Sequence, residues 1–203
     1  MLKKKIDNKI FYTIIIILVL IVSGIAYSLW TEKSILTLPE QIFYSYFVKL
    51  KNPNIVIYKE KRELALCDGD KKIKTFKIGL GREPVGDKTK RGDSKTPVGD
   101  YYICIKPDKS NYYLSLGLSY PNIKDAENGL KNNIIDENTY QKIVRSIRNQ
   151  ERPPWDTPLG SHIMIHGGGA ARDWTDGCIG VDNYVMDILW SHCKIGTTVT
   201  ILP

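Results

Sequence analysis

Residues 54–81 read NIVIYKEKRELALCDGDKKIKTFKIGLG and decide the fold class. Aliphatic and aromatic side chains alternate with polar ones along this stretch, and Asp68-Gly69-Asp70 interrupts it as a turn. A period of two residues is typical of strands with one buried face. The pattern returns in GDYYICIK, residues 99–106, and in TTVTIL, residues 197–202. The sequence therefore predicts a run of short antiparallel strands and a mainly β domain with a sandwich-like core.

A few helices accompany the strands. Residues 136–148 begin with Asp136 as N-cap and carry apolar side chains on one face, at Tyr140, Ile143, Val144 and Ile147. A second helix is expected after Asp182, whose side chain can cap NYVMDILWSHC, and Gly196 should end it. The polar insertion 122–150, which contains the first helix, fits either a lid over a binding site or a surface elaboration.

The N-terminal region predicts a membrane anchor. Residues 11–30, FYTIIIILVLIVSGIAYSLW, contain no charge, and twenty helical residues span roughly the 30 Å of a bilayer core. The preceding residues carry four lysines against Asp7, so the N-terminus should stay in the cytoplasm and the remaining chain should be exported. A buried core helix and a signal peptide cleaved after Gly24-Ile25-Ala26 are the alternatives. Because the apolar run continues to Trp30, an uncleaved single-pass anchor on residues 1–30 is favoured, followed by an amphipathic stalk, 31–53, and a catalytic domain, 54–203.

Composition narrows the class of partner. The 203 residues are 42% hydrophobic and 25% charged with a net charge of +7, as in an ordinary folded chain. Residues 31–203 keep 25 Lys and Arg against 21 Asp and Glu, scattered without the aromatic interleaving of a nucleic-acid groove. We therefore expect no nucleic-acid partner, and anionic cell-wall polymers as neighbours.

The four cysteines are too few for a disulfide scaffold or a metal knuckle. Cys67 and Cys104 would form a disulfide only if their strands were adjacent, and a role as small buried hydrophobes is favoured for both.

The candidate chemistry lies in two glycine-flanked motifs, His166-Gly167-Gly168-Gly169 and Thr175-Asp176-Gly177-Cys178. A cysteine nucleophile needs a base, access for substrate and backbone N–H donors for the oxyanion. His166 would be the base, and the Gly177 and Cys178 amides would hold the oxyanion. His162 and His166 are expected on one strand, HIMIH, where same-face residues four apart are separated by about 13 Å, which is too far to share one zinc ion.

These motifs resemble the L,D-transpeptidase catalytic domain (YkuD-type) family, which has a His-Gly turn and a [Ser/Thr]-x-Gly-Cys nucleophile motif. The segment 94–102, SKTPVGDYY, is similar to the family's KTPxGxF/Y turn. Further similarity to one branch with a DWTxGC motif lies in three segments, 113–122, 153–160 and 173–175. The resemblance covers about residues 54–203.

The resemblance implies a transferase of peptidoglycan biosynthesis, cell-wall organisation and cell shape, acting on stem peptides. Cys178 would attack the carbonyl of the third residue, usually meso-diaminopimelate, expel D-Ala and leave a thioester. In the family a backbone carbonyl orients the histidine, here that of Gly167. An amine from another stem then gives a 3-3 cross-link, a lipoprotein lysine gives an anchor, and water gives hydrolysis. No metal or organic cofactor is implied.

Two positions depart from the family pattern: many members have His where Asp176 stands and Arg where Gly180 stands. Arg172 would replace that missing carboxylate clamp or remain a solvated charge, and Asp176 would either stabilise protonated His166 or face water. Trp174 is the best aromatic candidate for stacking on substrate. A hydrolase, either an L,D-carboxypeptidase or one releasing peptidoglycan-linked lipoprotein, and a silent wall-binding module remain alternatives to the transferase.

Overall fold

The computed structural model describes residues 48–107 and 109–203, together with Val19, Ile42 and Tyr44. The chain divides into two compact units, Met1–Phe43 and Tyr44–Pro203, and the second is the one described below. The predicted anchor and most of the predicted stalk lie outside the described residues. In the part that is described, no helix is both long and apolar enough to cross a membrane.

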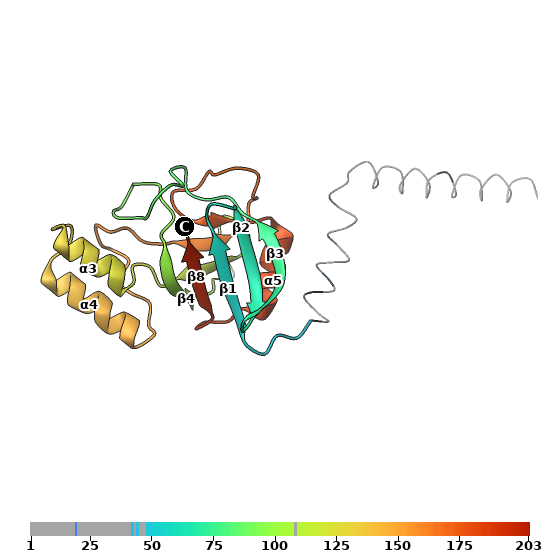
Figure 1. Ribbon diagram of the computed structural model, residues 1–203, viewed down its shortest axis with the longest axis horizontal. Coiled ribbons are helices and arrows are strands. Elements are labelled where there is room, and N and C mark those ends of the chain that lie inside the picture. The colour runs from blue at the N-terminus through green and yellow to red at the C-terminus, as the bar shows by residue number, and fades with distance from the viewer. Residues whose placement is uncertain (1–18, 20–41, 43, 45–47, 108) are drawn as a thin grey trace, which may run out of the picture. The chain divides into compact units, whose positions relative to one another are not determined.

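The second unit is built on one eight-stranded sheet (Figure 1). Its order is β3-β2-β1-β8-β4-β5-β6-β7. The strands are β1 (Pro53–Tyr58), β2 (Glu63–Asp68), β3 (Lys71–Lys77), β4 (Gly99–Ile105), β5 (Ser115–Leu118), β6 (Met164–His166), β7 (Ile179–Gly180) and β8 (Thr198–Leu202). The mainly β prediction is confirmed, as are the predicted strands in residues 54–77, 99–105 and 197–202.

The expectation of an entirely antiparallel arrangement is wrong at two places. β1 pairs parallel with β8, and β6 pairs parallel with β7. Both pairings join strands separated by long connections, as parallel pairs require. The fold is a single curved sheet around one core rather than two separate sheets.

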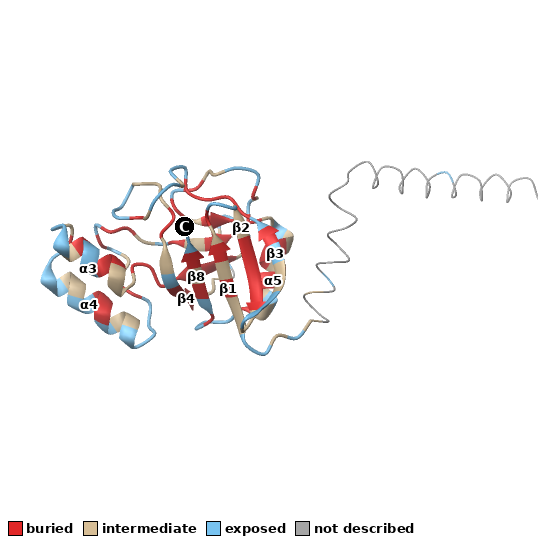
Figure 2. Ribbon diagram, in the orientation of Figure 1, coloured by how far each residue is buried: buried red, intermediate tan, exposed pale blue. Residues whose placement is uncertain are grey.

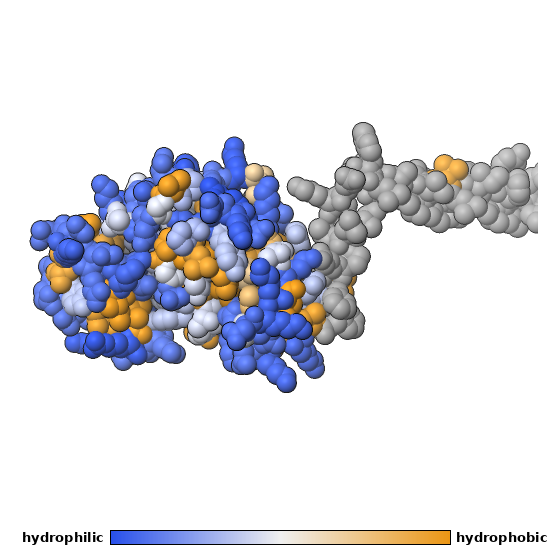
Figure 3. Space-filling model, in the orientation of Figure 1, coloured by the Kyte–Doolittle hydropathy of each residue, from blue (hydrophilic) through white to orange (hydrophobic). Residues whose placement is uncertain are grey.

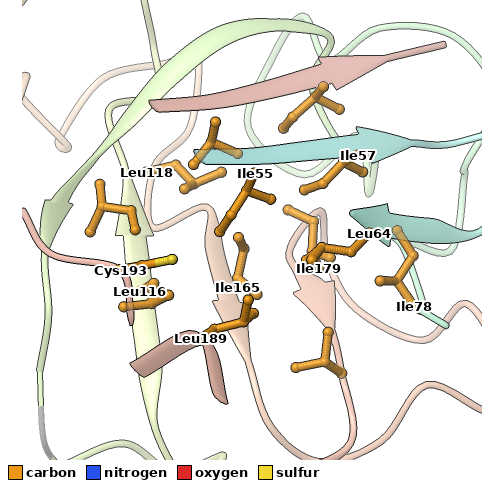
Figure 4. Packing of buried hydrophobic residues seen from close by; sticks show 14 of the residues in the cluster. Ile55, Ile57, Leu64, Ile78, Leu116, Leu118, Ile165, Ile179, Leu189 and Cys193 are labelled. Carbon is orange, nitrogen blue, oxygen red and sulfur yellow. The ribbon is translucent and has the colours of Figure 1, made fainter. Parts of the chain in front are cut away.

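The core collects buried aliphatic side chains from both ends of the sheet and from helix α5 (Asn183–His192). Ile55, Ile57 and Leu64 from β1 and β2 face Leu116, Ile165 and Leu189 from β5, β6 and α5 (Figure 4). Each fully buried side chain of this size contributes about 1.5–3 kcal/mol relative to an exposed one. The outer surface is mostly hydrophilic in the view of Figure 3. This core fixes the strands that carry the site.

Two helices, not one, occupy the 122–150 insertion. α3 (Ile123–Lys131) begins with a capping box between Asn122 and Asp125, and α4 (Glu137–Arg148) begins at the predicted N-cap Asp136, which accepts from the Thr139 N–H at 2.8 Å. The two helices form a hairpin with its own small core, made by Ala126, Ile135, Ile143 and Leu159. Their outer faces are largely exposed (Figure 2).

The capping prediction for α5 is wrong in its detail. Asp182 is the N-cap residue, but its side chain makes no capping hydrogen bond. Its Oδ1 accepts instead from the Ala170 N–H at 3.3 Å, which ties the glycine-rich loop to the helix start. The helix also ends at His192, before Gly196, because Cys193 turns to an extended conformation.

Cys67 and Cys104 cannot form a disulfide in this fold. They lie on β2 and β4, which are separated by β1 and β8. Three strand spacings amount to about 14 Å, whereas a disulfide needs Cα atoms within about 7 Å. Both thiols are free and buried, as the favoured prediction has it.

Candidate active site

The pairing of β6 with β7 brings the two glycine-flanked motifs together. Ile165 is in register with Ile179, and His166 with Gly180. Cys178 immediately precedes β7, so it lies level with Met164, on the same face of the sheet as His166. Diagonal neighbours of this kind have Cα atoms roughly 7–8 Å apart, a separation that an imidazole and a thiol can bridge.

Cys178 and His166 line one cavity of about 400 Å³. The remaining lining comes from the connection between β4 and β5 and from the residues around β6: Pro107, Lys109, Ser110, Asn111, Tyr112, Ser115, His162 and Met164. A larger cavity of about 600 Å³, lined by Lys59, Arg62, Val85 and others, contains neither Cys178 nor His166. The smaller cavity is therefore the one that holds a nucleophile and a base.

His166 is held as a neutral base. Its Nδ1 lies 2.7 Å from the Gly167 carbonyl oxygen. Since a carbonyl can only accept, Nδ1 carries the proton and Nε2 keeps a free lone pair. Burial lowers the pKa of His166, while the bond to Gly167 opposes that shift. The unprotonated imidazole is therefore favoured near neutral pH.

Two aromatic rings frame the imidazole. Tyr112 stacks on His166 with centroids 4.8 Å apart and planes inclined by 26°. Trp174 meets His166 edge-on at 5.5 Å and also contacts Tyr112 at 5.3 Å. The Trp174 indole N–H donates to the Gly169 carbonyl at 3.2 Å. Trp174, predicted to stack on substrate, thus packs against His166, and Tyr112 contacts both rings.

Cys178 is a protonated thiol in its resting position. Its Sγ donates to the His162 carbonyl at 3.2 Å. Burial raises the pKa of the Cys178 thiol, and the negative charge of Asp176 raises it further, whereas the Met164 backbone N–H and the charge of Lys88 lower it. Attack on a carbonyl therefore requires a base at the moment of reaction.

Gly177 has a conformation that other residues rarely adopt. Its φ is +126°, and a Cβ there would lie 2.6 Å from the Lys95 carbonyl oxygen. The close approach of the Lys95 backbone thus depends on this glycine. The Gly177 N–H, predicted to serve the oxyanion, donates to Thr175 Oγ1 at 3.1 Å, and that hydroxyl donates to the Cys178 carbonyl at 2.7 Å.

The loop before Cys178 is fixed by acidic residues. Asp173 accepts from the Arg62 guanidinium at 2.8 to 3.1 Å and from the Leu80 N–H at 2.9 Å. Asp176 is exposed and pairs with Arg82. Asp176 is therefore paired with a surface arginine and not with His166. The hydrogen-bond partner of His166 Nδ1 is the Gly167 carbonyl.

The sequence matches the L,D-transpeptidase catalytic domain family over residues 52–201. The chain belongs to this family. No curated protein matches it significantly.

Three solved structures are similar to the chain. The helical cell shape determining protein Pgp2 of Campylobacter jejuni is 22% identical with a TM-score of 0.50, covering 79% of this chain and 53% of that one. Bd1075 of Bdellovibrio bacteriovorus is 21% identical with a TM-score of 0.49, covering 75% and 48%. An L,D-transpeptidase of Xylanimonas cellulosilytica is 14% identical with a TM-score of 0.45, covering 76% and 62%. The chain thus corresponds to roughly half to three-fifths of the length of these proteins.

Gly180, the position where an arginine is expected from the family pattern, has no room for a side chain. A Cβ would lie 2.8 Å from the Gly169 carbonyl oxygen and 3.0 Å from Trp174 Nε1. Trp174 therefore fills the space into which a side chain at this position would project. Arg172 is exposed and is absent from the lining of the Cys178 cavity, so the structure does not bring it to the nucleophile.

The insertion and the second histidine are placed differently from the expectation. None of the residues lining the Cys178 cavity comes from 122–150, and whether the hairpin acts as a lid stays a prediction. The predicted strand HIMIH is shorter, since β6 starts at Met164 and His162 has a φ of +57°. His162 consequently enters the same cavity as His166. Within the described ranges, no three His, Cys, Asp or Glu side chains are grouped to hold a metal.

Sequence reasoning missed Tyr112 and the contribution of His162 through its carbonyl. Tyr112 belongs to a connection with no motif of its own, and only the tertiary fold places its ring on His166. For His162, the preceding Leu159-Gly160-Ser161 is a usable signal, because a glycine before a short strand indicates a turn that displaces the strand start.

Proposed function

We propose that this protein is a peptidoglycan L,D-transpeptidase that works by cysteine acyl transfer. Cys178 attacks the carbonyl between the third residue and the terminal D-Ala of a stem tetrapeptide, D-Ala leaves as the amine, and the acyl group remains on Sγ as a thioester. An amine acceptor from a second stem then releases the acyl group as a 3-3 cross-link. Membership of the family supports the peptidoglycan substrate class.

The mechanism rests on the protonation states of His166 and Cys178, which line the same cavity. His166 is neutral with Nε2 free, and Cys178 is a neutral thiol. Nε2 accepts the thiol proton as the C–S bond forms and returns it to the leaving amine of D-Ala. The Gly167 carbonyl replaces the acidic side chain that orients histidine in other nucleophilic sites.

The oxyanion is assigned to the Cys178 N–H, with the Gly177 N–H joining only if it leaves Thr175 Oγ1. The proposed location is the extracytoplasmic side of the cell membrane, with residues 1–30 as a single-pass anchor. This rests on the charge pattern of the N-terminus and on the location of the substrate class.

Mass spectrometry of muropeptides tests the proposal. The full-length chain in detergent is incubated with disaccharide tetrapeptides, beside Cys178→Ala and His166→Gln variants. The intact protein should remove D-Ala and produce 3-3 dimers, while Cys178→Ala should produce neither. Tripeptides without dimers would make the protein a hydrolase of the same family, and intact tetrapeptides would contradict the assigned donor.

A separate measurement distinguishes an enzyme from a silent binding module. A carbapenem should add its mass to the intact protein and leave the Cys178→Ala variant unchanged. Absence of any adduct would remove Cys178 as a nucleophile, whatever the muropeptide assay gives.

A further inference from the structure

The Cys178 cavity is suited to an anion but lacks the arginine that many family members carry near the nucleophile. Its lining contains Lys109, two histidines and no Asp or Glu. The stem peptide proposed as donor carries free carboxylates. Gly180 is blocked by Trp174, so the carboxylate needs a cation from elsewhere. Lys109 lies in the lining; Arg152 and Arg172 both lie outside it, but Arg152 is connected to the lining residue His162 through the Trp155 ring.

A row of neighbouring residues crosses the sheet from Cys178 toward the part of the chain that contains Trp155 and Arg152. Ile105 on β4 is in register with Gly117 on β5, Gly117 with Met164 on β6, and Cys178 lies beside Met164. A Cβ on Gly117 would lie 2.5 Å from Ile105 Cγ1 and 3.4 Å from the Trp155 ring. The absence of a side chain at Gly117 therefore lets Trp155 lie directly on the sheet, in the row that ends at Cys178.

Trp155 is the centre of a cluster of three side chains. The His162 ring lies 4.4 Å from the indole, centroid to centroid, and the Arg152 guanidinium lies 5.0 Å from the indole centroid. His162 lines the cavity with Cys178. The Arg152–Trp155–His162 cluster is thus continuous with the wall of the cavity.

Arg152 is prepared to bind a ligand. It is exposed, and no carboxylate of the described residues pairs with it, whereas Arg62, Arg82 and Arg91 each pair with an aspartate. Contact with the indole face restrains the guanidinium and leaves its N–H edges available. A restrained, unpaired guanidinium is a good partner for a carboxylate, which it can bind through two parallel hydrogen bonds.

The charge of Arg152 also reaches the cavity. Burial lowers the pKa of His162, and the positive charges of Arg152 and Arg91 lower it further. Arg91 is paired with Asp156, so the unpaired arginine charge on the Trp155 side of the cavity is that of Arg152. A bound carboxylate should therefore lie on that side of Cys178.

We propose that Arg152, held by Trp155, is the carboxylate-binding residue for the donor stem peptide. This inference rests on the proposed function and adds its specificity determinant. The stem offers two carboxylates near the scissile bond: that of the leaving D-Ala and that on the side chain of the third residue. Both present the same chemistry to a guanidinium, so the experiment separates them.

Calorimetric binding to the full-length Cys178→Ala protein tests the proposal without turnover. The ligands are the disaccharide tetrapeptide, the same compound amidated at its C-terminus, and the same compound amidated at the third-residue side chain. Adding Arg152→Gln should weaken binding of the unmodified peptide roughly tenfold to a hundredfold, the range for a hydrogen bond to a charged group. Arg152→Lys should fall between, because it keeps the charge and loses the paired geometry.

Removing the bound carboxylate from the ligand should have the same effect as removing Arg152 from the protein. One amidated ligand should therefore bind the Cys178→Ala protein as weakly as the unmodified peptide binds the Arg152→Gln variant. The Arg152→Gln substitution should not weaken binding of that amidated ligand any further. That ligand identifies which carboxylate is bound. Arg172→Gln, a matched loss of an exposed arginine from the nucleophile loop, should change affinity by less than about threefold. Circular dichroism of each variant checks that the fold is retained.

Equal affinity of the Arg152→Gln and parent proteins for the unmodified peptide would overturn the proposal. The proposal would also be overturned if the Lys109→Gln variant bound the unmodified and amidated peptides equally well while the Arg152→Gln variant still preferred the unmodified peptide. Because binding is measured without Cys178, a tetrapeptide that binds in an Arg152-dependent manner but is not converted by the wild type would refute the proposed reaction and leave the binding residue standing.

Discussion

Gly180 offers a direct test of whether the fold excludes a side chain at the position where the family pattern predicts arginine. A Cβ at this position would lie 2.8 Å from the Gly169 carbonyl oxygen and 3.0 Å from Trp174 Nε1. These two atoms are the acceptor and donor of one 3.2 Å hydrogen bond. A methyl group would therefore sit against both partners of that bond, and one of them is rigid backbone.

The cost of Gly180→Ala follows from these contacts. Overpacking of a close-packed site costs about 1–3 kcal/mol, and the lost Trp174 hydrogen bond about 1 kcal/mol. Alanine restricts the unfolded chain more than glycine does, which returns about 0.5–1 kcal/mol. We expect a net loss of about 1–3 kcal/mol, with Gly180→Arg at or beyond the upper end.

Urea unfolding of the full-length chain, followed by circular dichroism, measures this loss. Carbapenem acylation of Cys178 should slow as well, because a displaced Trp174 no longer supports His166 at its 5.5 Å edge contact. The loss caused by Gly180→Ala should be smaller when Trp174→Leu is already present, since part of the obstruction is then gone. If Gly180→Ala were within about 0.5 kcal/mol of wild type, or if Gly180→Arg accelerated acylation, the steric explanation would be wrong.

Four further outcomes are expected. The rate of Cys178 acylation should fall as pH decreases through the pKa of His166, which burial places below its ordinary value of 6.5, so activity should persist somewhat below pH 6.5. Tyr112→Ala should move that acid limb upward by exposing the imidazole, whereas Tyr112→Phe should keep it, and identical pH profiles for the two variants would contradict the shielding role of the ring. Asp136→Ala should destabilise the α3–α4 hairpin by about 1 kcal/mol without changing acylation, as monitored by hydrogen exchange, because Asp136 caps α4 away from the cavity lining. Asp173→Asn should reduce acylation and stability together, because Arg62 and the Leu80 N–H both lose a charged acceptor, and a change in neither would rule out Asp173 as the brace of the loop.

The strands could be predicted because side-chain alternation is a local property. Residues 54–77 and 99–105 carry it plainly, and the structure has strands there. The parallel partnership of β1 and β8 could not be predicted in the same way, since it joins residues about 140 positions apart through core packing. Local pattern defines a strand and one buried face, whereas its neighbour depends on the whole chain.

Helix α3 was missed although its start signal is present. Asn122 and Asp125 form a capping box, but Gly129 and several polar residues weaken the periodic pattern that follows. The glycine is explained only by tertiary structure, because a Cβ there would lie 2.7 Å from the Leu159 side chain. Close packing of the hairpin thus required a residue that lowers helix propensity.

In the site, too, some features follow from local sequence and others depend on the tertiary structure. Cys178 and His166 stand out because few residue types can act as nucleophile and base, and each is flanked by glycine. The partners that tune them are backbone groups, the carbonyls of Gly167 and His162 and the N–H of Met164, which any residue supplies. Residue identity therefore predicts the reacting atoms, while their protonation states depend on the fold.

Those protonation states determine the order of events in the proposed reaction. A preformed thiolate–imidazolium pair would place a negative charge next to Asp176 in a buried site, whereas the resting thiol is neutral and bonded to the His162 carbonyl. The thiol must therefore turn from that carbonyl toward His166 Nε2 before or during attack. His162 is next to both groups: its carbonyl accepts from the thiol, and its ring contacts Trp155, which also contacts Arg152. A donor whose carboxylate binds Arg152 is thus positioned beside the residue that holds the nucleophile in its resting state, and donor binding and thiol release occur on the same short segment.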